Sequence, residues 1–364
     1  MKRRDIPLRA MVLAAGEGRR LRPLTVFWAK PAIPLLGASP IECAMELLRR
    51  ARVSDVVVNL HHNPETIEET LAKTDWGRDF ALHYSRETEI LGTAGGLKQA
   101  ERWLSDGTFL LLNGDTILDT VVTELVDWHR ARSAEATLLL RPKPEGTVYT
   151  ELGLAPDGRI VSIGKKGEAS PALMFAGLWV LEPTIFQRLT AGRFARLEVD
   201  LLPKLILDGT AFGFVAELPW FDIGTPEAYL QACENMARSG VFRTTWRAEV
   251  VESLPSSPLG SLVLAGPNTS IDPEARFTGT SILGANCRVE RGAHLRRAVL
   301  WDDVTVGDSA LVRDSVIASD VSLAPASRTV NKLVARLRRR SRDRRSSLRA
   351  REIAGDCVVA PIKS

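Results

Sequence analysis

An apolar residue recurs at every sixth position in the last third of the chain. The repeat runs without a gap through Ile271, Phe277, Leu283, Val289, Leu295 and Trp301. Small residues follow most of these positions four residues later, namely Ala275, Ser281, Cys287, Ala293 and Thr305. A six-residue period with one inward apolar side chain per repeat is typical of a parallel β-helix, whose stacked coils bury a continuous column. Ordinary strands with chance spacing are the alternative, which six consecutive matches disfavour.

The period resumes at Val306 and Val312 after a slip of one residue. We expect the repeats to end near Leu323, which gives the β-helix roughly three coils. His294 is the only histidine among the repeats.

The first two-thirds of the chain alternate short Val- and Leu-rich stretches with helical patterns. We expect strands at residues 10–15, 55–60, 80–84, 108–113 and 136–140. We expect helices at 40–52, from Asn63 and Pro64 onward, with Asn63 as the N-cap, and at 94–104. This alternation predicts a mainly parallel sheet covered on both faces, with ligands beyond the carboxyl ends of its strands. Glycine-bearing loops at Gly16 and Gly114 follow two of the expected strands.

Composition and charge narrow the classes of function. No apolar run approaches the roughly 18 residues that span a bilayer, and the basic N-terminus lacks the features of a signal peptide, so we expect a cytoplasmic protein without a membrane partner. The four cysteines lie far apart, which indicates reduced thiols rather than a metal site. The net charge is +4, but residues 332–351 hold ten basic residues and one acidic residue. The rest of the chain is mildly acidic, which argues against a nucleic-acid-binding body.

The loop after the first expected strand reads VLAAGEGRRLRPLTVFWAKP, from Val12 to Pro31. Gly16 and Gly18 permit a tight turn close to a ligand, and backbone amides after a strand can cradle phosphate oxygens. A dinucleotide-binding loop is the alternative reading, but Leu21 stands at its third glycine. Arg19, Arg20 and Arg22 crowd the place where a cofactor pyrophosphate would rest. Together with Lys30 they supply separated cations, which suit a pyrophosphate that must leave.

This stretch resembles the motif G-x-G-x-R-L-x-P-L-T…K-P of the sugar-1-phosphate nucleotidyltransferases, also called NDP-sugar pyrophosphorylases. The match places Arg20, rather than Arg19, on the family arginine and Lys30 on the family lysine. Ala29 departs from the family proline.

Three further stretches fit the same family in order: EILGTAGGLKQA (89–100), LLNGDTILD (111–119) and WFDIGTPEAYLQA (220–232). The resemblance implies that the first contacts the nucleobase and sugar, and that the other two supply the family aspartates, Asp115 and Asp222. The implied nucleotide-binding residues are Ala14, Ala15, Gly16, Gly18, Arg20, Gly92, Thr93, Ala94, Gly95 and Asn113. The implied sugar-phosphate contacts are Lys165 (or Lys166), Gly177 and Glu198, with Asp200 as a further candidate. Phe175 stands where the family often has asparagine, which puts the usual sugar contact in doubt.

The resemblance implies a nucleotidyl transfer that needs Mg²⁺. The sugar phosphate would attack the α-phosphorus of a nucleoside triphosphate (NTP), and pyrophosphate would leave. Asp115 and Asp222 would be the metal ligands, because Mg²⁺ typically takes one or two carboxylates plus phosphate oxygens. Arg20 and Lys30 would be catalytic by neutralising the leaving group. We expect GTP and mannose 1-phosphate as substrates, with glucose-1-phosphate thymidylyl- or uridylyltransferase and manno-heptose-1-phosphate guanylyltransferase as alternatives.

The implied α/β architecture is a Rossmann-like, mainly parallel mixed sheet followed by a short left-handed β-helix. We expect an N-terminal extension at 1–10, a catalytic domain at 11–240, the β-helix at 241–325 and a basic segment at 326–364. A short β-helix suggests a homo-oligomer whose subunits cover the exposed coil end. Two other classes stay open: a non-catalytic subunit that binds a sugar nucleotide, and an acyltransferase built on the β-helix.

Overall fold

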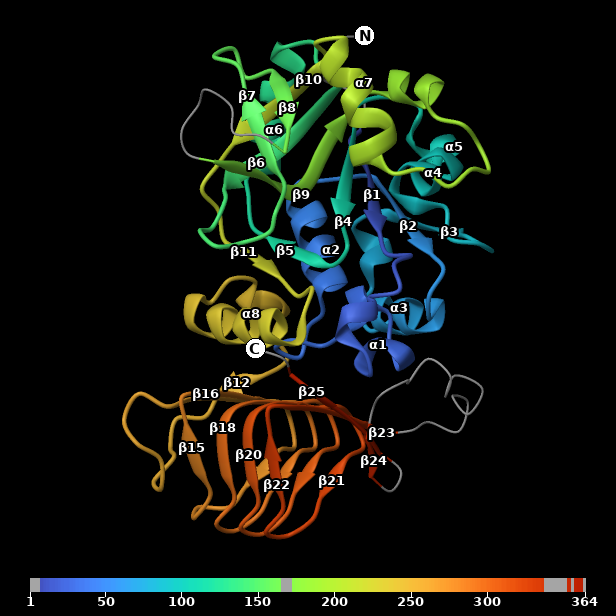
Figure 1. Ribbon diagram of the computed structural model, residues 1–364. Coiled ribbons are helices and arrows are strands. Elements are labelled where there is room, and N and C mark those ends of the chain that lie inside the picture. The colour runs from blue at the N-terminus through green and yellow to red at the C-terminus, as the bar shows by residue number, and fades with distance from the viewer. Residues whose placement is uncertain (1–6, 165–171, 337–351, 355–356, 363–364) are drawn as a thin grey trace. The chain divides into compact units, whose positions relative to one another are not determined.

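The structure is a computed structural model that describes residues 7–164, 172–336, 352–354 and 357–362 (Figure 1). The chain forms two compact units. The first holds the described residues up to Gly16 together with Ala44–Trp220, and the second holds Glu17–Cys43 and the described residues from Phe221 onward. The second unit thus also takes in residues 221–240, and the predicted domain boundary at residue 240 stays a prediction. The segment Glu17–Cys43, which bears Arg20 and Lys30, groups with the β-helix.

A mixed sheet organises the first unit. Its strands are β1 (Arg9–Leu13), β2 (Asp55–Leu60), β3 (Ala81–Arg86), β4 (Phe109–Asn113), β6 (Ala136–Pro142), β7 (Glu151–Leu154), β8 (Ile160–Ile163), β9 (Leu173–Leu181) and β10 (Ala211–Val215). The main order is β10-β6-β9-β4-β1-β2-β3, with β7 and β8 joined beside β9. β9 runs antiparallel to β4 and β6, while β1 is parallel to β2 and β4. The five expected strands are thus confirmed within a residue or two.

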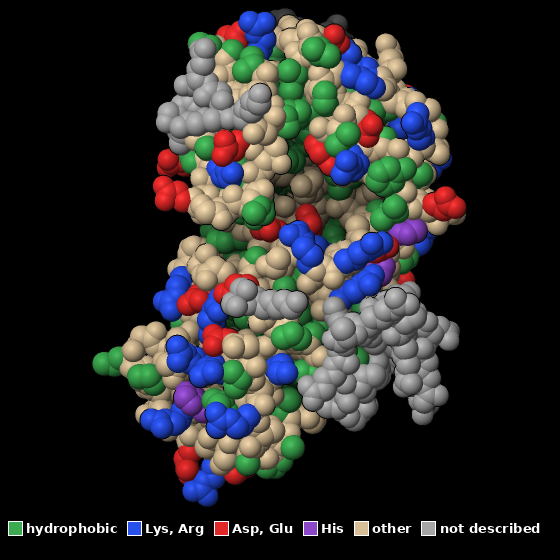
Figure 2. Space-filling view, in the orientation of Figure 1, with side chains coloured by type: hydrophobic (Ala, Val, Ile, Leu, Met, Phe, Trp, Pro, Cys, Tyr) green, Lys and Arg blue, Asp and Glu red, His purple; other side chains and the backbone are tan. Residues whose placement is uncertain are grey.

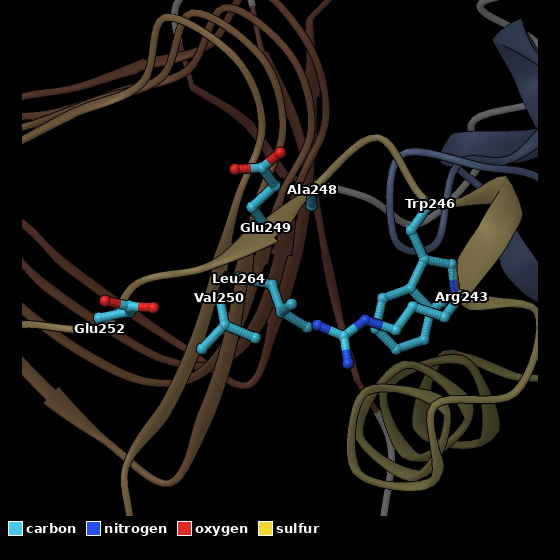
Figure 3. A pocket seen from close by; sticks show the side chains of 7 residues that line it. All are labelled: Arg243, Trp246, Ala248, Glu249, Val250, Glu252 and Leu264. Carbon is cyan, nitrogen blue, oxygen red and sulfur yellow. The ribbon is translucent and has the colours of Figure 1, made fainter.

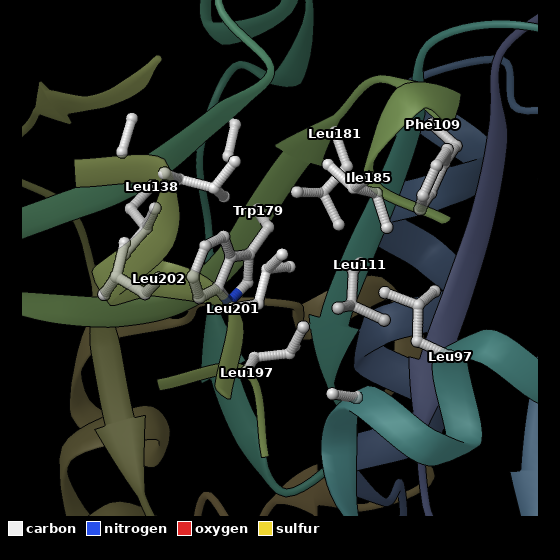
Figure 4. Close-up of a cluster of buried hydrophobic side chains, with 14 of the residues drawn as sticks. Leu97, Phe109, Leu111, Leu138, Trp179, Leu181, Ile185, Leu197, Leu201 and Leu202 are labelled. Carbon is white, nitrogen blue, oxygen red and sulfur yellow. The ribbon is translucent and has the colours of Figure 1, made fainter. Parts of the chain in front are cut away.

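Helices cover both faces of this sheet. They are α2 (Pro40–Arg50), α3 (Pro64–Leu71), α4 (Gly92–Gln99), α5 (Glu101–Leu104), α6 (Val122–Ala131) and α7 (Leu202–Leu207), with a π-helical turn η6 (Leu197–Leu201) before α7. α4, α5, η6 and α7 pack against one face in a core that includes Leu97, Leu111 and Trp179 (Figure 4). α6 contacts β6, β9 and β10. The sequence therefore predicted the layers correctly.

Two local predictions are wrong in detail. Asn63 precedes α3 as expected, but its φ is +48° and its side chain makes no capping hydrogen bond. Its carbonyl instead accepts a hydrogen bond from the Thr66 hydroxyl at 2.8 Å. The sheet also begins before the expected boundary, because Arg9 pairs with Asp55 in register and its Nη1 lies 2.7 Å from an Asp106 carboxylate oxygen. Residues 9 and 10 are therefore part of the fold rather than an extension.

The second unit contains the predicted parallel β-helix. Its strands are β13 (Leu262–Ala265), β14 (Ser270–Ile271), β15 (Arg276–Thr278), β16 (Thr280–Leu283), β17 (Arg288–Val289), β18 (His294–Leu300), β19 (Thr305–Val306), β20 (Leu311–Ile317), β21 (Ser322–Leu323), β22 (Arg328–Val330) and β23 (Lys332–Arg336). β12 (Glu249–Val250) precedes them and pairs antiparallel with β13. Phe277 pairs with Leu295, and Leu295 pairs with Val312. The coil thus takes 18 residues before the slip and 17 after it, as the spacing of these pairs shows.

A stack of asparagine and aspartate residues turns the chain at one corner of successive coils. Asn268, Asn286, Asp303 and Asp320 all have positive φ, between 56° and 64°. Asn286 accepts a hydrogen bond from Asn268 Nδ2 at 3.2 Å and donates one to Asp303 at 3.0 Å. Asparagine and aspartate tolerate this left-handed conformation better than most residues, so their recurrence fixes where each coil bends.

The β-helix continues beyond Leu323, where we expected it to end. β22 and β23 both pair with β20, and β25 (Cys357–Pro361) then pairs antiparallel with β23. β24 (Glu352–Ala354) pairs in turn with β25. Lys332–Arg336 is therefore a strand of the β-helix, although we expected it to belong to the basic segment at 326–364. Residues 337–351 lie outside the described residues. Since the chain itself occupies the β23 edge, that edge does not need a second subunit, and a homo-oligomer stays a prediction.

The remaining elements of the second unit lie before the β-helix in the chain. α8 (Pro226–Ser239) packs on β16, β18 and β20, and α1 (Leu24–Phe27) contacts β23. Arg297 on β18 ties α8 down through Glu227 (2.5 Å) and Glu234 (3.4 Å). The short helices are η2 (Arg19–Leu21), η3 (Lys30–Ala32) and η7 (Arg243–Thr245). The remaining strands are β5 (Thr116–Leu118), which belongs to the first unit, and β11 (Trp220–Asp222), which begins at the last residue of that unit.

The described part of the chain holds no helix long and apolar enough to cross a membrane. On the face drawn in Figure 2, basic and acidic side chains of the described residues are interspersed over each unit.

The pairing of β25 with β23 predicts a stability effect. Val358 is fully buried opposite Ala335, so Val358→Asp should lower the free energy of unfolding by about 3 kcal/mol, because an unpaired carboxylate is buried. Urea unfolding followed by circular dichroism measures this change. Exposure of the β23 edge should also cause self-association in size-exclusion chromatography. Pro361→Ala, at an exposed position of the same strand, is the control; equal stability of the two variants would contradict the pairing.

Candidate active site

The carboxyl ends of β1 and β4 lie side by side in the first unit. Leu13 pairs with Asn113, and Gly114 N donates a hydrogen bond to Leu13 O at 2.9 Å. A Cβ on Gly114 would lie only 2.6 Å from Leu13 O, so any larger residue would push the strand ends apart. The loop Ala14–Gly16 and the carboxylate of Asp115 therefore emerge at the same edge of the sheet, where parallel α/β sheets bind ligands.

A buried pair, Asn59 and Glu87, joins this loop to the loop before α4. Ala14 N donates to Asn59 Oδ1 at 2.7 Å, and Asn59 Nδ2 donates to Glu87 Oε1 at 2.7 Å. Glu87 Oε2 accepts from Leu91 N at 2.9 Å. Glu87 is only 5% exposed, so these bonds satisfy a carboxylate that would otherwise be costly to bury. The sequence analysis missed both residues; the available signal was a polar residue at the end of a buried strand, Asn59.

The glycines of the predicted base-binding loop contact the chain's own backbone. A Cβ on Gly92 would meet Ala195 O at 2.4 Å, and one on Gly95 would meet Arg193 O at the same distance. Ala94 N donates to Ala195 O at 2.9 Å. Thr93 Oγ1 accepts a hydrogen bond from the backbone N–H of residue 197 at 2.9 Å. These glycines thus let segment 193–197 pack against the start of α4, and contact of Gly92 and Gly95 with a nucleobase stays a prediction.

Gly177 brings β9 close to the residue after Asp115. Its φ is +104°, and a Cβ there would lie 3.3 Å from the Thr116 side chain. Beside it, Trp220 Nε1 donates to Ala176 O at 2.9 Å. Phe175 packs against Trp179 with ring centroids 5.4 Å apart. The position where the family often has asparagine therefore belongs partly to the core.

The structure gives less support to the other predicted sugar-phosphate contacts. Glu198 lies on η6 with more than half of its side chain exposed, 3.8 Å from Arg196. Asp200 accepts a hydrogen bond from Arg196 N at 2.7 Å. Lys165 and Lys166 lie outside the described residues.

In the second unit, the part of the motif loop that runs from Glu17 to Pro31 folds tightly around Gly18 and Lys30. Gly18 has a φ of +58°, and a Cβ there would lie 2.8 Å from Thr25 Cγ2 and 3.1 Å from Lys30 Cβ. Thr25 Oγ1 donates to Gly18 O at 2.8 Å. Lys30 is only 7% exposed. The glycine therefore allows the loop to close onto a lysine whose side chain is shielded from solvent.

Arg20 and Asp222 converge on Gly224 in the same unit. A Cβ on Gly224 would lie 2.7 Å from Arg20 Nη2 and 2.9 Å from Asp222 Oδ2. Asp222 Oδ1 accepts a hydrogen bond from Gly224 N at 2.8 Å. Arg19, by contrast, is 75% exposed and pairs with Glu17. The fold thus separates the two adjacent arginines, one beside a predicted metal ligand and the other facing solvent.

The predicted metal ligands fall in different units, Asp115 in the first and Asp222 in the second, and their shared role stays a prediction. Among the described residues, no group of three His, Cys, Asp or Glu side chains is arranged to hold a metal. Asn113 ends β4, one residue from Gly114. Lys98 donates to Phe186 O at 2.9 Å and pairs with Glu101, so it holds α4 in place.

A pocket of about 390 Å³ lies in the second unit between η7 and the first strands of the β-helix (Figure 3). Arg243, Trp246, Ala248, Glu249, Val250, Glu252 and Leu264 line it. It contains none of the predicted site residues.

Comparisons with known proteins agree with this arrangement. A family profile described as nucleotidyl transferase matches residues 9–239, and one described as GlmU-like, C-terminal hexapeptide matches residues 273–331. The mannose-1-phosphate guanyltransferase of Yarrowia lipolytica is 31% identical over 84% of this chain and 94% of its own length. The UTP–glucose-1-phosphate uridylyltransferase of Synechocystis is 29% identical over 85% of this chain and 87% of its own.

Among solved structures, HddC from Yersinia pseudotuberculosis complexed with GMP-PN has a TM-score of 0.55 and 25% identity, covering 63% of this chain and 99% of that one. The chain belongs to the nucleotidyl transferase family. These matches confirm the resemblance and the enzyme class predicted from the sequence, that of the sugar-1-phosphate nucleotidyltransferases with C-terminal hexapeptide repeats.

The Asn59–Glu87 pair predicts a kinetic effect. Glu87→Gln replaces one acceptor with an amide donor, which then faces the N–H of Leu91 or the amide of Asn59. We expect the KM for the nucleotide to rise about tenfold, because both loops lose a fixed hydrogen bond. Steady-state kinetics with varied nucleotide measure it. Glu69→Gln, which removes an exposed carboxylate on α3, is the control; an unchanged KM in the Glu87 variant would contradict the positioning role.

Proposed function

We propose that this protein transfers a nucleotidyl group from an NTP to a sugar 1-phosphate and releases pyrophosphate. The placement of Arg20 against Asp222 at Gly224 supports this proposal most directly. A guanidinium beside a carboxylate suits a site where a metal-bound triphosphate must be held by a cation and an anion together. Lys30 in the same loop is only 7% exposed, so the positive charge of this loop is not simply surface charge.

The chemistry needs positioning and charge stabilisation more than an activated nucleophile. The sugar phosphate is already anionic, so no side chain has to remove a proton before it attacks the α-phosphorus. In the proposed reaction the amides of Ala15 and Gly16 hold phosphate oxygens at the end of β1, while the amide of Ala14 stays bonded to Asn59. Arg20 and Lys30 then neutralise the charge that develops on the leaving pyrophosphate.

The two carboxylates of the proposed site are suitable ligands for Mg²⁺. Carboxylate oxygens are its preferred protein ligands, and one or two of them with substrate phosphates usually suffice. Asp115 and Asp222 are the two carboxylates in the proposed site, and the hydrogen bond from Gly224 N holds the orientation of Asp222. When bound, the ion would polarise the α-phosphate and offset its negative charge.

For the substrates, we propose GTP and mannose 1-phosphate. The Yarrowia lipolytica relative is named as a mannose-1-phosphate guanyltransferase, and a similar structure is a complex with GMP-PN. The Synechocystis relative, named as a UTP–glucose-1-phosphate uridylyltransferase, makes UTP with glucose 1-phosphate the competing pair. Phe175 is the residue of this chain that departs from the family near the expected sugar site.

A grid of substrate pairs tests the proposed function. Pyrophosphate release should be largest with GTP and mannose 1-phosphate, require Mg²⁺ and vanish with EDTA. The grid crosses GTP, UTP, dTTP, ATP and CTP with mannose, glucose and N-acetylglucosamine 1-phosphates, and an enzyme-coupled pyrophosphate assay reads it. Preference for UTP and glucose 1-phosphate would overturn the substrates but keep the reaction. No release with any pair would overturn the reaction.

The two adjacent arginines give a matched pair of variants. Arg20→Ala should lower kcat by about 100-fold or more, because a charge beside the departing pyrophosphate is lost. Arg19→Ala should stay within about threefold of the wild type, because an exposed ion pair contributes little. Both variants are measured under the same saturating conditions. Similar kcat values for the two would contradict the assignment of Arg20.

A further inference from the structure

Three aromatic side chains of the second unit form a cluster in which two are buried and Trp28 is half-buried. The rings of Trp28 and Trp301 meet edge to face, with centroids 4.8 Å apart and planes at 89°. Trp301 Nε1 donates a hydrogen bond to Tyr229 Oη at 3.0 Å, and Tyr229 Oη donates to the carbonyl of Pro34. Tyr229 and Trp301 are both fully buried. The cluster is therefore a connected set of contacts.

Each member comes from a different part of the unit. Trp28 follows α1, Tyr229 lies on α8, and Trp301 follows β18 of the β-helix. Trp301 is also the last member of the uninterrupted six-residue series. The core of the β-helix holds the earlier members Phe277, Leu283, Val289 and Leu295. Trp301 instead contacts Trp28, which lies in the motif loop that ends at Pro31.

The cluster holds the segment that carries Lys30 at both of its ends. Trp28 lies two residues before Lys30, and Pro34 lies four residues after it. The short helix η3, which begins at Lys30, therefore sits between two points fixed on Tyr229 and Trp301.

Arg247, which lies between α8 and the β-helix, supports the same segment at Gly37 and Glu42. Arg247 Nη1 donates to Gly37 O at 2.7 Å, and Arg247 also pairs with Glu42. Gly37 has a φ of +77°, and a Cβ there would lie 2.8 Å from Arg247 Cβ. The segment that carries Lys30 is thus attached to α8, to the β-helix and to the linker between them.

We propose that Trp301 is a positioning residue: through Trp28 and Tyr229, the β-helix sets the place of Lys30 and so takes part in the nucleotidyl transfer. This inference rests on the proposed function of Lys30. Trp301 lies on the β-helix and acts only through its two partners.

The chemistry of the cluster makes it a rigid connection. Burial raises the pKa of Tyr229 well above its ordinary value, so its hydroxyl keeps the proton that it donates to Pro34. Loss of the Trp301 ring would leave a cavity beside Trp28 and an unfilled acceptor on Tyr229. Small displacements of a catalytic group are costly, since about 1 Å of misplacement lowers a rate about 100-fold.

Three variants test the proposal in the full-length protein. Trp301→Leu removes both contacts, Trp301→Phe keeps an aromatic ring but removes the N–H, and Phe277→Leu is the control in the β-helix core. We expect kcat to fall about 10- to 100-fold in Trp301→Leu and less in Trp301→Phe. In the same variants the KM for the sugar 1-phosphate should change less than about threefold, because Lys30 serves the nucleotide. The KM for pyrophosphate in the reverse reaction should rise.

The controls separate a positioning role from a loss of folding. Phe277→Leu should lower the melting temperature and leave kcat within about twofold, since its side chain lies in the β-helix core. An unchanged kcat in Trp301→Leu, or an equal fall in Phe277→Leu, would overturn the proposal. If Trp301→Leu does not fold, Trp301→Phe alone tests the proposal, by its kcat and its melting temperature. A fall in kcat at an unchanged melting temperature supports the positioning role, and an unchanged kcat overturns it.

Failure of the proposed function gives a different pattern. The wild type would then release no pyrophosphate with any substrate pair. The dissociation constant for GTP, measured by calorimetry with the same variants, then replaces kcat. A larger dissociation constant for GTP in Trp301→Leu than in Phe277→Leu supports the positioning role, and equal constants overturn it.

Discussion

The close approach of two strand ends is the constraint on which the first unit depends. β1 and β4 run parallel as neighbours, and the backbone after β4 passes within hydrogen-bonding distance of Leu13 O. Only glycine fits at position 114, because a side chain would collide with that carbonyl. The loop Ala14–Gly16 and Asp115 therefore leave the sheet at one edge. Asn59 and Glu87 extend the same edge to the start of α4 by a chain of buried hydrogen bonds.

The second unit combines a repetitive scaffold with a short functional segment. The β-helix coils stack a column of apolar side chains, and α8 packs across them. Glu17–Cys43 groups with this scaffold although it is distant in sequence. The two cations expected at the leaving group are therefore carried by the same compact unit as the repeats. Under our proposal the β-helix contributes to the geometry of the reaction as well as to stability.

The strongly periodic features were predictable from the sequence, and the features that depend on tertiary contacts were not. The register of Phe277, Leu295 and Val312 follows directly from the six-residue period and its slip. The end of the β-helix was placed too early although β22 and β23 keep the 17-residue spacing from β20. Thr329 stands opposite Val312 in place of an aliphatic residue, and β23 lies in the basic stretch that begins at Lys332. The expected N-terminal extension reached two residues too far, because Arg9 pairs in the sheet and is held by acidic side chains from other segments.

The candidate site shows the same division. The motif separated Arg20 from Arg19, and the structure places the two in different environments. The sequence alone gave no partner for Asn59, because Glu87 lies 28 residues away. The loop glycines were interpreted as space for a nucleobase, yet segment 193–197 fills the space beside Gly92 and Gly95. A glycine marks a close approach, but only the fold reveals which group makes it.

Isotope transfer tests the central claim most directly. Mannose 1-phosphate labelled with ¹⁸O in its phosphate is incubated with GTP, Mg²⁺ and the enzyme, and mass spectrometry follows the label. Attack of the sugar phosphate on the α-phosphorus predicts that all of the label stays in the nucleotide sugar and that pyrophosphate carries none. Label in pyrophosphate would contradict nucleotidyl transfer. A labelled sugar phosphate recovered unchanged with every NTP, together with tight binding of a sugar nucleotide, would instead indicate a non-catalytic binding protein.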